Sequence, residues 1–339
     1  MSALTRRHLL GMATGMAVSA LSPASWSSRW PTSGSGFARI GGIEQWITIR
    51  GHNRAHTAML FLHGGPGEAQ SSFLSAFAPW EKRYIVAQWD QRGAGKTFGR
   101  NGISTPNMTM DQLARDVVEV TQCVLSQLRV PKLLLVGHSW GSVLGLTAMR
   151  LQPELFHAFV GTGQIVSGKK MVEDWRQSAV SHAQAAKDAK VVAELSGLKA
   201  SDFAEMSNLF AIFNWQAPFT GSDLGYIINT EEAALGPRSR PLNKDAVDWY
   251  NGKFLLSLPK LWPSVIDFDA SWAGYDLPVP FFVIQGRDDR RTSPEAARLF
   301  VDKVHAPAKG YTAIDGGHFA CFTNPTEFLN TLHNNILRI

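Results

Sequence analysis

Short apolar runs alternate with longer segments of helical periodicity over most of the chain. Residues 58–62 and 84–89 are continuous apolar runs, as expected for strands that are covered on both faces. Residues 43–50 instead alternate roughly between apolar and polar side chains, which predicts an edge strand. Two further buried strands are predicted at residues 132–136 and 281–284, and a last strand at 311–314.

Helix start signals stand between these runs. Thr109 to Gln112 forms a capping-box pattern, and apolar residues at helical spacing follow it up to Leu128. Another helix is predicted from Ser142 to Pro153, one starts at Ser293-Pro294, and a last one is capped at residues 324–327. Alternating strands and helices of this length predict a mostly parallel sheet with helices on both faces.

One long segment breaks the alternation. Residues 166–276 contain no run that resembles a buried strand, and they include helical patterns at 171–195 and 202–213. A stretch of about 110 residues is far longer than a crossover requires, so we expect an inserted helical cap over the sheet. It contains five tryptophans, which we expect mostly to pack small helices together and in part to line a substrate pocket: Trp175, Trp215, Trp249, Trp262 and Trp272. The core domain is then formed by residues 36–165 and 277–339.

The N-terminus has the pattern of an export signal. Arg6 and Arg7 precede a weakly apolar stretch rich in Gly, Ala and Met, as in a twin-arginine signal peptide over residues 1–24. The apolar stretch is shorter than the ~20 residues that span a bilayer. The expected location is therefore periplasmic or secreted, with the twin-arginine export machinery as a partner.

Composition excludes several other classes. The 339 residues are 45% hydrophobic and 18% charged, as in an ordinary globular enzyme. The formal net charge is +5 with scattered basic residues, so no nucleic-acid partner is expected. Cys123 and Cys321 are the two cysteines, too few for a disulfide framework, and we expect two independent buried thiols. No metal site or cofactor is expected.

The sequence Gly137-His138-Ser139-Trp140-Gly141 follows the predicted strand 132–136 and precedes a predicted helix. Strand, G-x-S-x-G and helix form the nucleophile elbow, in which Ser139 takes a strained backbone and the glycines avoid collisions. The pattern alone is weak, because short Ser/Gly patterns recur by chance. Its weight depends on partners elsewhere in the chain.

Those partners occur in the chain order serine, acid, histidine that α/β-hydrolases use. Asp288 and Asp289 follow the predicted strand 281–284, and the register favours Asp289 as the acid. His318 follows the last predicted strand between small and aromatic neighbours. The imidazole would take the proton of Ser139, and the carboxylate would fix the imidazole tautomer. The sequence therefore predicts an α/β-hydrolase fold with a Ser–Asp–His triad.

Acyl transfer also needs donors for the oxyanion. The N–H of Trp140, directly after the nucleophile, is one candidate. The second is expected in the loop His63-Gly64-Gly65-Pro66-Gly67, with Gly65 preferred over Gly64, since Pro66 has no N–H. The glycines of this loop lack the following Lys-Ser/Thr of a phosphate-binding loop.

Five ordered motifs together resemble the proline iminopeptidase family, whose members are α/β-hydrolase-fold serine peptidases that remove N-terminal proline. They are HGGPG at residues 63–67, DQRGAG at 90–95, GHSWGS at 137–142, GRDD at 286–289 and GHF at 317–319. The resemblance covers both core segments and implies Ser139 as nucleophile, Asp289 as acid and His318 as base. Asp90 and Arg92 are interpreted as a buried ion pair that braces a turn.

The cap departs from the family pattern. Such enzymes hold the substrate's amino terminus with cap glutamates, one of which follows a tryptophan, whereas here Gln216 follows Trp215. A neutral amide accepts a hydrogen bond from an ammonium group but does not neutralise it. Trp215, Gln216 and Gly64 are kept as candidate substrate contacts. Three glutamates are possible substitutes for the missing acid: Glu205, Glu231 and Glu232.

Two classes of function remain open. The first is an exported serine hydrolase that cleaves an amide or ester of a small molecule or short peptide through an acyl-enzyme. Within it, release of N-terminal proline competes with carboxylesterase, lactonase or blocked-amide hydrolase activity. The second is a non-catalytic ligand-binding protein with the same fold, which would not need a triad and two oxyanion donors. Epoxide hydrolases and dehalogenases of this fold use an aspartate nucleophile, and this elbow has serine.

Overall fold

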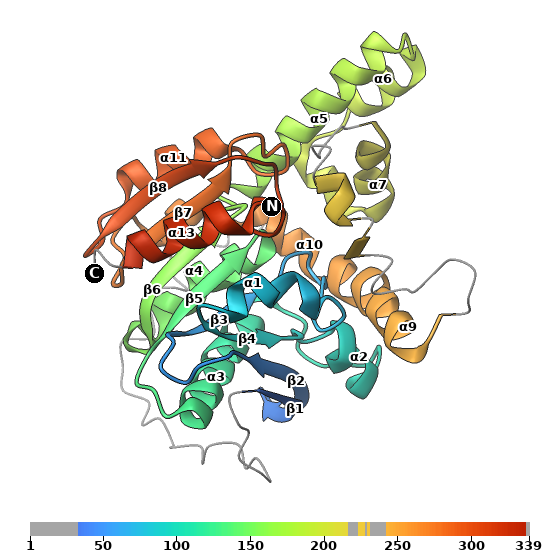
Figure 1. Ribbon diagram of the computed structural model, residues 1–339. Coiled ribbons are helices and arrows are strands. Elements are labelled where there is room, and N and C mark those ends of the chain that lie inside the picture. The colour runs from blue at the N-terminus through green and yellow to red at the C-terminus, as the bar shows by residue number, and fades with distance from the viewer. Residues whose placement is uncertain (1–32, 216–222, 228, 231–241, 337–339) are drawn as a thin grey trace, which may run out of the picture.

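The computed structural model describes residues 33–215, 223–227, 229–230 and 242–336 (Figure 1). Its centre is an eight-stranded sheet in the order β1-β2-β4-β3-β5-β6-β7-β8. The strands are β1 (Gly34–Ile40), β2 (Ile43–Arg50), β3 (Ala58–Leu62), β4 (Ile85–Trp89), β5 (Leu133–His138), β6 (Phe156–Thr162), β7 (Phe281–Gly286) and β8 (Lys309–Ile314). β1, β2 and β4 pair antiparallel, and every pair from β4 to β8 is parallel.

The sequence patterns did not predict β1 or β6, and they wrongly placed β2 at the edge of the sheet. β1 forms the sheet edge and pairs along its whole length with β2, so the expectation that residues 43–50 form an edge strand is wrong. The alternation there reflects partial exposure of one face of β2. β6 was also missed, although it lies between β5 and β7 and is almost fully buried. Its exposed His157 and its glycine interrupt the apolar run that marks the other interior strands.

Helices cover both faces of the sheet. Along β3, Leu60 and Leu62 belong to one buried cluster and Met59 and Phe61 to the other, because successive side chains point to opposite faces. The first face is covered by α3 (Met110–Leu128), α4 (Trp140–Leu151) and α11 (Pro294–Lys303). The second is covered by η2 (Leu74–Phe77), α1 (Ala78–Glu81), α12 (Ala320–Thr323) and α13 (Pro325–Ile336). α2 (Gly95–Asn101) follows β4, and η3 (Pro153–Leu155) precedes β6.

Two of the predicted helix start signals, at Thr109 and Ser293, form the expected caps. Thr109 accepts a hydrogen bond from Gln112 N at 3.2 Å before α3, and Ser293 accepts one from Ala296 N at 3.1 Å before α11. These caps satisfy backbone donors that the helices themselves leave without acceptors. Cys321 is buried, as expected, whereas Cys123 is only half-buried, and the two do not form a disulfide with each other.

Between β6 and β7 every long element that the structure describes is helical. Figure 1 shows these helices gathered to one side of the sheet. They are α5 (Gly168–Ala185), α6 (Ala189–Ser196), η4 (Ala200–Ala204), α7 (Met206–Trp215), α9 (Lys244–Asn251), the π-helical η5 (Gly252–Ser257), α10 (Leu258–Asp267) and η6 (Ala270–Ala273). The continuous helix expected at 171–195 is two helices, because Lys187 has φ 58° and the chain turns before Asp188 caps α6.

The cap shares its core with the sheet. Trp175 and Trp262 stack with ring centroids 5.8 Å apart, and both belong to the cluster that contains β3 and α4. Trp249 is also buried, whereas Trp272 is 64% exposed. Most of the cap tryptophans therefore pack helices together, as expected. Among the described residues, no helix combines the length and apolarity that crossing a bilayer requires.

Candidate active site

The predicted nucleophile lies at the turn between β5 and α4. Ser139 has φ 53° and ψ −119°, a conformation that costs energy for a residue with a side chain. Its N–H donates to Thr162 O at 2.9 Å. A Cβ on Gly137 would lie 2.4 Å from Gly141 O, and one on Gly141 would lie 2.1 Å from Leu62 O. The sharp turn therefore requires both glycines of the elbow.

The predicted acid and base are in contact. His318 Nδ1 lies 3.1 Å from Oδ1 and 3.0 Å from Oδ2 of Asp289, and both side chains are buried. Asp288, the neighbour that the sequence left as an alternative, is exposed. Burial opposes ionisation of Asp289, but His318 and the hydrogen bonds from Thr292 outweigh it and lower the pKa of the carboxyl. An ionised Asp289 holds the proton of His318 on Nδ1 and leaves Nε2 as an acceptor.

The carboxylate of Asp289 is fixed by its own loop. Its Oδ1 accepts from Arg291 N at 2.8 Å and from Thr292 N at 2.9 Å, and its Oδ2 accepts from Thr292 Oγ1 at 2.7 Å. Gln285, on β7, adds a longer contact at 3.4 Å. The acid is thus held in one orientation toward His318.

His138, inside the elbow motif, and Gly163, which no motif marks, hold His318 beside the elbow. His138 Nε2 lies 3.0 Å from His318 O, so this imidazole donates to the carbonyl. Burial lowers the pKa of His138 to about 4 and keeps the ring neutral. Gly163 has φ 54°, and a Cβ there would lie 2.8 Å from His318 Cε1. Because Gly163 follows Thr162, the acceptor of Ser139 N–H, the end of β6 touches both the predicted nucleophile and the predicted base.

The candidate oxyanion donors lie on two elements that meet at the elbow. Trp140 is the first residue of α4, where backbone N–H groups have no acceptor within the helix. A Cβ on Gly64 would lie 3.2 Å from Ser139 Cβ, so this loop passes directly beside the predicted nucleophile. Gly65 has φ 112° and lines the pocket described below. The choice between Gly64 and Gly65 as the second donor stays a prediction.

The interpretation of Asp90 and Arg92 as one ion pair is wrong. Arg92 pairs with Asp116 on α3, at 2.8 Å and 3.1 Å, with both side chains fully buried. Asp90 accepts from Ser71 Oγ at 2.6 Å and from Lys96 N at 2.8 Å. Each residue braces the turn that follows β4, through a different partner. The error arises because Asp116, 24 positions away on a helix, carries no motif.

A cavity of about 580 Å³ lies between the cap and the loops at the elbow. Its wall is largely apolar and aromatic, with Gly65 and Phe319 from the core and, from the cap, Leu209, Phe210, Phe213, Leu224, Tyr226, Ile227, Trp249, Phe254, Leu258 and Trp262. Its charged lining residues are Glu68, Lys253 and Arg291. The volume suits a small substrate.

The charged side chains that line this cavity each contact another side chain of the protein. Lys253 Nζ, from η5, lies 2.8 Å from Glu68 Oε1. Burial opposes ionisation of Glu68, yet Lys253 lowers the pKa of this carboxyl to about 2. Arg291 lies over the rings of Trp175 and Phe213 at 4.2 Å and 4.4 Å. Burial lowers the pKa of Arg291 to about 10, so it remains a cation at neutral pH.

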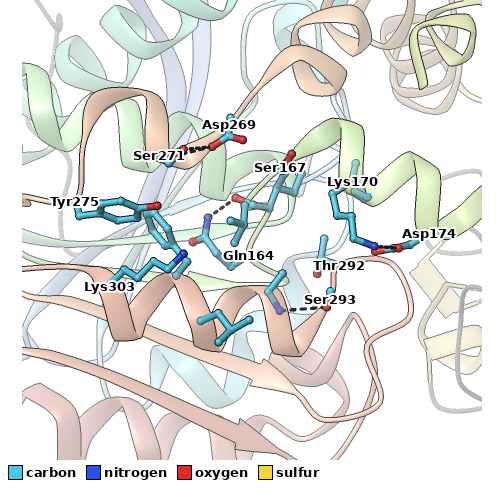
Figure 2. Close-up of a pocket in the computed structure, with 16 residues that line it drawn as sticks. Gln164, Ser167, Lys170, Asp174, Asp269, Ser271, Tyr275, Thr292, Ser293 and Lys303 are labelled. Atoms are coloured by element: carbon cyan, nitrogen blue, oxygen red, sulfur yellow. Dashed lines mark hydrogen bonds and ion pairs between the residues drawn. The ribbon is translucent and has the colours of Figure 1, made fainter. Parts of the chain in front are cut away.

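A second, smaller cavity of about 280 Å³ lies beside the acid loop (Figure 2). Gln164, Thr292 and Ser293 form its core side, and Lys170 with Asp174 stands on the cap side. Asp269 accepts from the N–H and hydroxyl of Ser271 at its rim. No residue of the five motifs lines this cavity, whereas Gly65 and Phe319 of those motifs line the larger cavity. We therefore expect the substrate in the larger cavity.

The candidate cap contacts have different outcomes. Gln216, Glu231 and Glu232 lie outside the described residues. Trp215 packs against the core cluster and is not among the described residues that line the larger cavity. Glu205 is exposed, next to η4. Among the described residues that line the larger cavity, the one carboxylate is that of Glu68, which follows the HGGPG motif directly and is paired with Lys253.

Comparison with known proteins confirms the fold and the family. Residues 57–325 match the model of a family described as alpha/beta hydrolase fold. A probable aminopeptidase of Bacillus subtilis is 27% identical over 86% of this chain and 93% of its own. A proline iminopeptidase of Lacticaseibacillus rhamnosus is 24% identical over 84% and 91%. The crystal structure of a proline iminopeptidase-related protein from Thermus thermophilus superposes with a TM-score of 0.62 at 18% identity, over 90% of this chain and 97% of that one.

Proposed function

The chain belongs to the alpha/beta hydrolase fold family, and from that premise we propose that it is a serine hydrolase that acts through an acyl-enzyme. The observation that carries the proposal is the contact of His318 with the buried, ionised Asp289 beside the strained elbow of Ser139. A protein that only binds a ligand needs neither the strain at Ser139 nor a fixed imidazole tautomer.

Each residue then has a distinct task. His318 Nε2 accepts the proton of Ser139 Oγ as the hydroxyl attacks the carbonyl of the substrate, while Asp289 stabilises the imidazolium that forms. The N–H groups of Trp140 and Gly65 or Gly64 stabilise the oxyanion. His318 gives its proton to the leaving amine or alcohol, and water then hydrolyses the acyl-enzyme by the same route.

Covalent labelling tests this proposal. We expect the purified protein to react with a fluorophosphonate probe and Ser139→Ala to remain unlabelled. Thr147→Ala, on the same helix, removes a hydroxyl that donates to the backbone of α4 and serves as the matched control. Labelling that persists in Ser139→Ala contradicts the assignment of the nucleophile. Stoichiometric ligand binding without turnover of any ester or amide favours the non-catalytic alternative.

For the substrate, we propose a small amide or ester whose acyl side fits the apolar cavity. Release of an N-terminal residue is the leading candidate, because relatives that match over most of the chain are named aminopeptidases or proline iminopeptidases. Carboxylesterase, lactonase or blocked-amide hydrolysis is the second candidate. One observation favours it: among the described lining residues, the carboxylate available to an ammonium group is Glu68, which is already paired with Lys253.

A matched pair of substrates separates the two candidates. Values of kcat/KM are measured for proline p-nitroanilide and its N-acetylated form, with Ser139→Ala as the blank. A strong preference for the free amine supports the aminopeptidase. Equal rates, or a preference for the blocked substrate, support the second candidate and direct the search to esters and lactones.

We also propose that the protein is exported by the twin-arginine machinery to the periplasm or the exterior. The support is the pattern at Arg6 and Arg7, which lies outside the described residues. Replacing both arginines by lysine keeps the charge and removes the pair. We expect the variant to accumulate in the cytoplasmic fraction with its signal uncleaved, and equal export of both forms contradicts the proposal.

A further inference from the structure

The loop that carries the predicted base is held by the cap as well as by the core. Asp223 lies in the described segment 223–227, within the residues 166–276 inserted between β6 and β7, and its side chain is fully buried. Its Oδ2 accepts from His318 N at 2.9 Å, and its Oδ1 accepts from Phe319 N at 3.0 Å. Each oxygen of one carboxylate therefore bonds to a separate N–H of the base loop.

The same segment packs on that loop with an aromatic ring. Tyr226 stacks on Phe322 with centroids 5.0 Å apart and planes 4° from parallel, and it contacts Phe319 at 4.8 Å. Leu224, Tyr226 and Ile227 also line the 580 Å³ cavity. One short segment thus forms part of the cavity wall and accepts hydrogen bonds from the backbone of the loop that carries His318.

The bonds of Asp223 complete the fixation of His318. Its side chain contacts Asp289, its carbonyl accepts from His138, and its N–H donates to Asp223. A buried carboxylate is costly unless its hydrogen bonds compensate for lost hydration, and bonds between an N–H and a carboxylate are about twice as strong as neutral ones. Two such bonds at adjacent residues hold the position of the loop, which sets where Nε2 lies.

We propose that Asp223 is a positioning residue for the catalytic base: it holds the loop of His318 from the cap, so that the wall of the substrate cavity and the placement of the imidazole are set by one segment. This inference rests on the proposed serine hydrolase function. Asp223 does not touch the reacting atoms. Its effect passes through His318 and is absent when His318 is absent.

The first test is the pair Asp223→Asn and Asp223→Ala, assayed with p-nitrophenyl acetate. Asn keeps an acceptor for one N–H without the charge, and Ala keeps none. We expect kcat to fall about 10-fold for Asn and about 100-fold for Ala, since small misplacements of a catalytic group have effects of this size. The value of KM should change less than about 2-fold, because this small ester does not fill the cavity. Phosphonylation of Ser139 should slow in parallel with kcat.

Asp188→Ala is the matched control. Asp188 is another carboxylate of the cap that accepts a backbone N–H, from Val191 at 3.0 Å, and it caps α6, which projects away from the sheet (Figure 1). We expect this variant to lose some thermal stability and to keep the kcat of the unmodified enzyme. A loss of kcat in Asp188→Ala equal to that in Asp223→Ala shows a general effect of loosening the cap and overturns the proposal.

A double variant separates positioning from a merely structural role. In a His318→Ala background, Asp223→Asn should leave the residual rate unchanged, because the group through which Asp223 acts is missing. A further loss equal to that seen with His318 present overturns the proposal, as does full kcat in Asp223→Asn and Asp223→Ala. If His318→Ala itself retains full activity, the serine hydrolase function falls instead. Asp223→Asn is nearly isosteric, so it keeps the test valid if the alanine variant does not fold.

Discussion

The sheet and the cap contribute to the site in different ways. In the sheet half, Ser139, Asp289 and His318 follow the ends of β5, β7 and β8, and glycines at the closest approaches leave no space for a side chain. In the cap half, the cavity wall is made of aromatic and aliphatic side chains from α7, segment 223–227, η5 and α10. The chemistry depends on backbone geometry, whereas substrate selection depends on how helices pack.

The two halves are nevertheless joined at the triad. Asp223 bonds to the base loop, and Trp175 on α5 donates its indole N–H to Arg291 O on the acid loop at 2.9 Å. The cap therefore contacts the loops of both the acid and the base. We therefore expect a change in the cap to alter kcat as well as KM.

The largest effect is expected from a change confined to the sheet half. Asp289→Asn replaces an acceptor beside His318 Nδ1 with an amide that cannot stabilise imidazolium, and we expect kcat to fall about 10⁴-fold. The fold should persist, because Asn retains an oxygen for the N–H groups of Arg291 and Thr292. Steady-state kinetics and circular dichroism measure the two effects.

Asp288→Asn is the control for that prediction. Asp288 is adjacent and exposed, so its neutralisation should leave kcat within about 2-fold, as is usual for surface changes. A large loss in Asp288→Asn with activity retained in Asp289→Asn would reverse the assignment of the acid.

The next-largest effect is expected at Gly163, directly after β6, where we test whether the base requires a glycine. Gly163→Ala places a methyl group 2.8 Å from His318 Cε1, and we expect the displaced imidazole to lower kcat about 100-fold. Gly274→Ala is the matched control, because Gly274 has φ 79° but nothing within 4 Å of a Cβ. It carries similar backbone strain without the contact, so we expect lower stability and unchanged kcat. Equal kcat in both alanine variants would show that Gly163 is not required by the base.

The sheet half could be predicted to a large extent, and the reasons are physical. Buried strands with uninterrupted apolar runs, such as β3 and β7, were found, while β6 was missed because His157 and Gly161 interrupt its pattern. The elbow and the loops with Asp289 and His318 carry local motifs, since each needs particular residues within a few positions. Gly163 has no motif, because its constraint comes from a side chain far along the chain.

The cap could be predicted only as a helical insertion. Helical periodicity shows which residues are buried, but not which helix they face, so Trp175 as a partner of the acid loop was not foreseen. Asp223 was missed because the two N–H groups that donate to its carboxylate belong to residues 318 and 319, which are 95 and 96 positions away. The family pattern predicts a substrate-binding acid in the cap, whereas the carboxylate of Glu68 lies on the HGGPG side of the cavity.

In the cap half, the pair of Lys253 and Glu68 is expected to affect which substrates are selected. Lys253→Met removes the partner of Glu68 and leaves its carboxylate uncompensated in the cavity. We expect the ratio of kcat/KM for proline p-nitroanilide to kcat/KM for its N-acetylated form to rise about tenfold. The reason is that the ammonium group of the free substrate no longer competes with Lys253 for the carboxylate of Glu68. The double variant Glu68→Gln/Lys253→Met carries neither charge and should abolish that gain. An unchanged ratio in Lys253→Met would place the substrate amine away from Glu68.

The smallest effect is expected from His63, a buried residue of the sheet half. It is a loss of stability that appears when the pH is lowered. His63 Nδ1 donates to Gly64 O, at 2.9 Å, and its Nε2 accepts from Gln91 N at 3.3 Å, so the ring must be neutral to accept. Burial lowers the pKa of His63 to about 4 from 6.5. The unfolded chain therefore binds a proton at a higher pH than the folded one, and the stability that neutral His63 contributes is present above about pH 6.5 and lost as pH falls toward 4.

That loss amounts to on the order of 3 kcal/mol once pH reaches 4. His138 acts in the same direction, whereas burial raises the pKa of Asp90 to about 6, which stabilises the folded protein as pH falls below that value. The total pH dependence mixes these opposing contributions, so the informative quantity is the difference between the unmodified protein and His63→Gln. Gln keeps an acceptor for Gln91 N–H without titrating, and its Tm should decline less between pH 7 and pH 4.5. Parallel Tm curves would mean that His63 is not the group whose protonation opposes folding, and that the loop beside the elbow tolerates a charge.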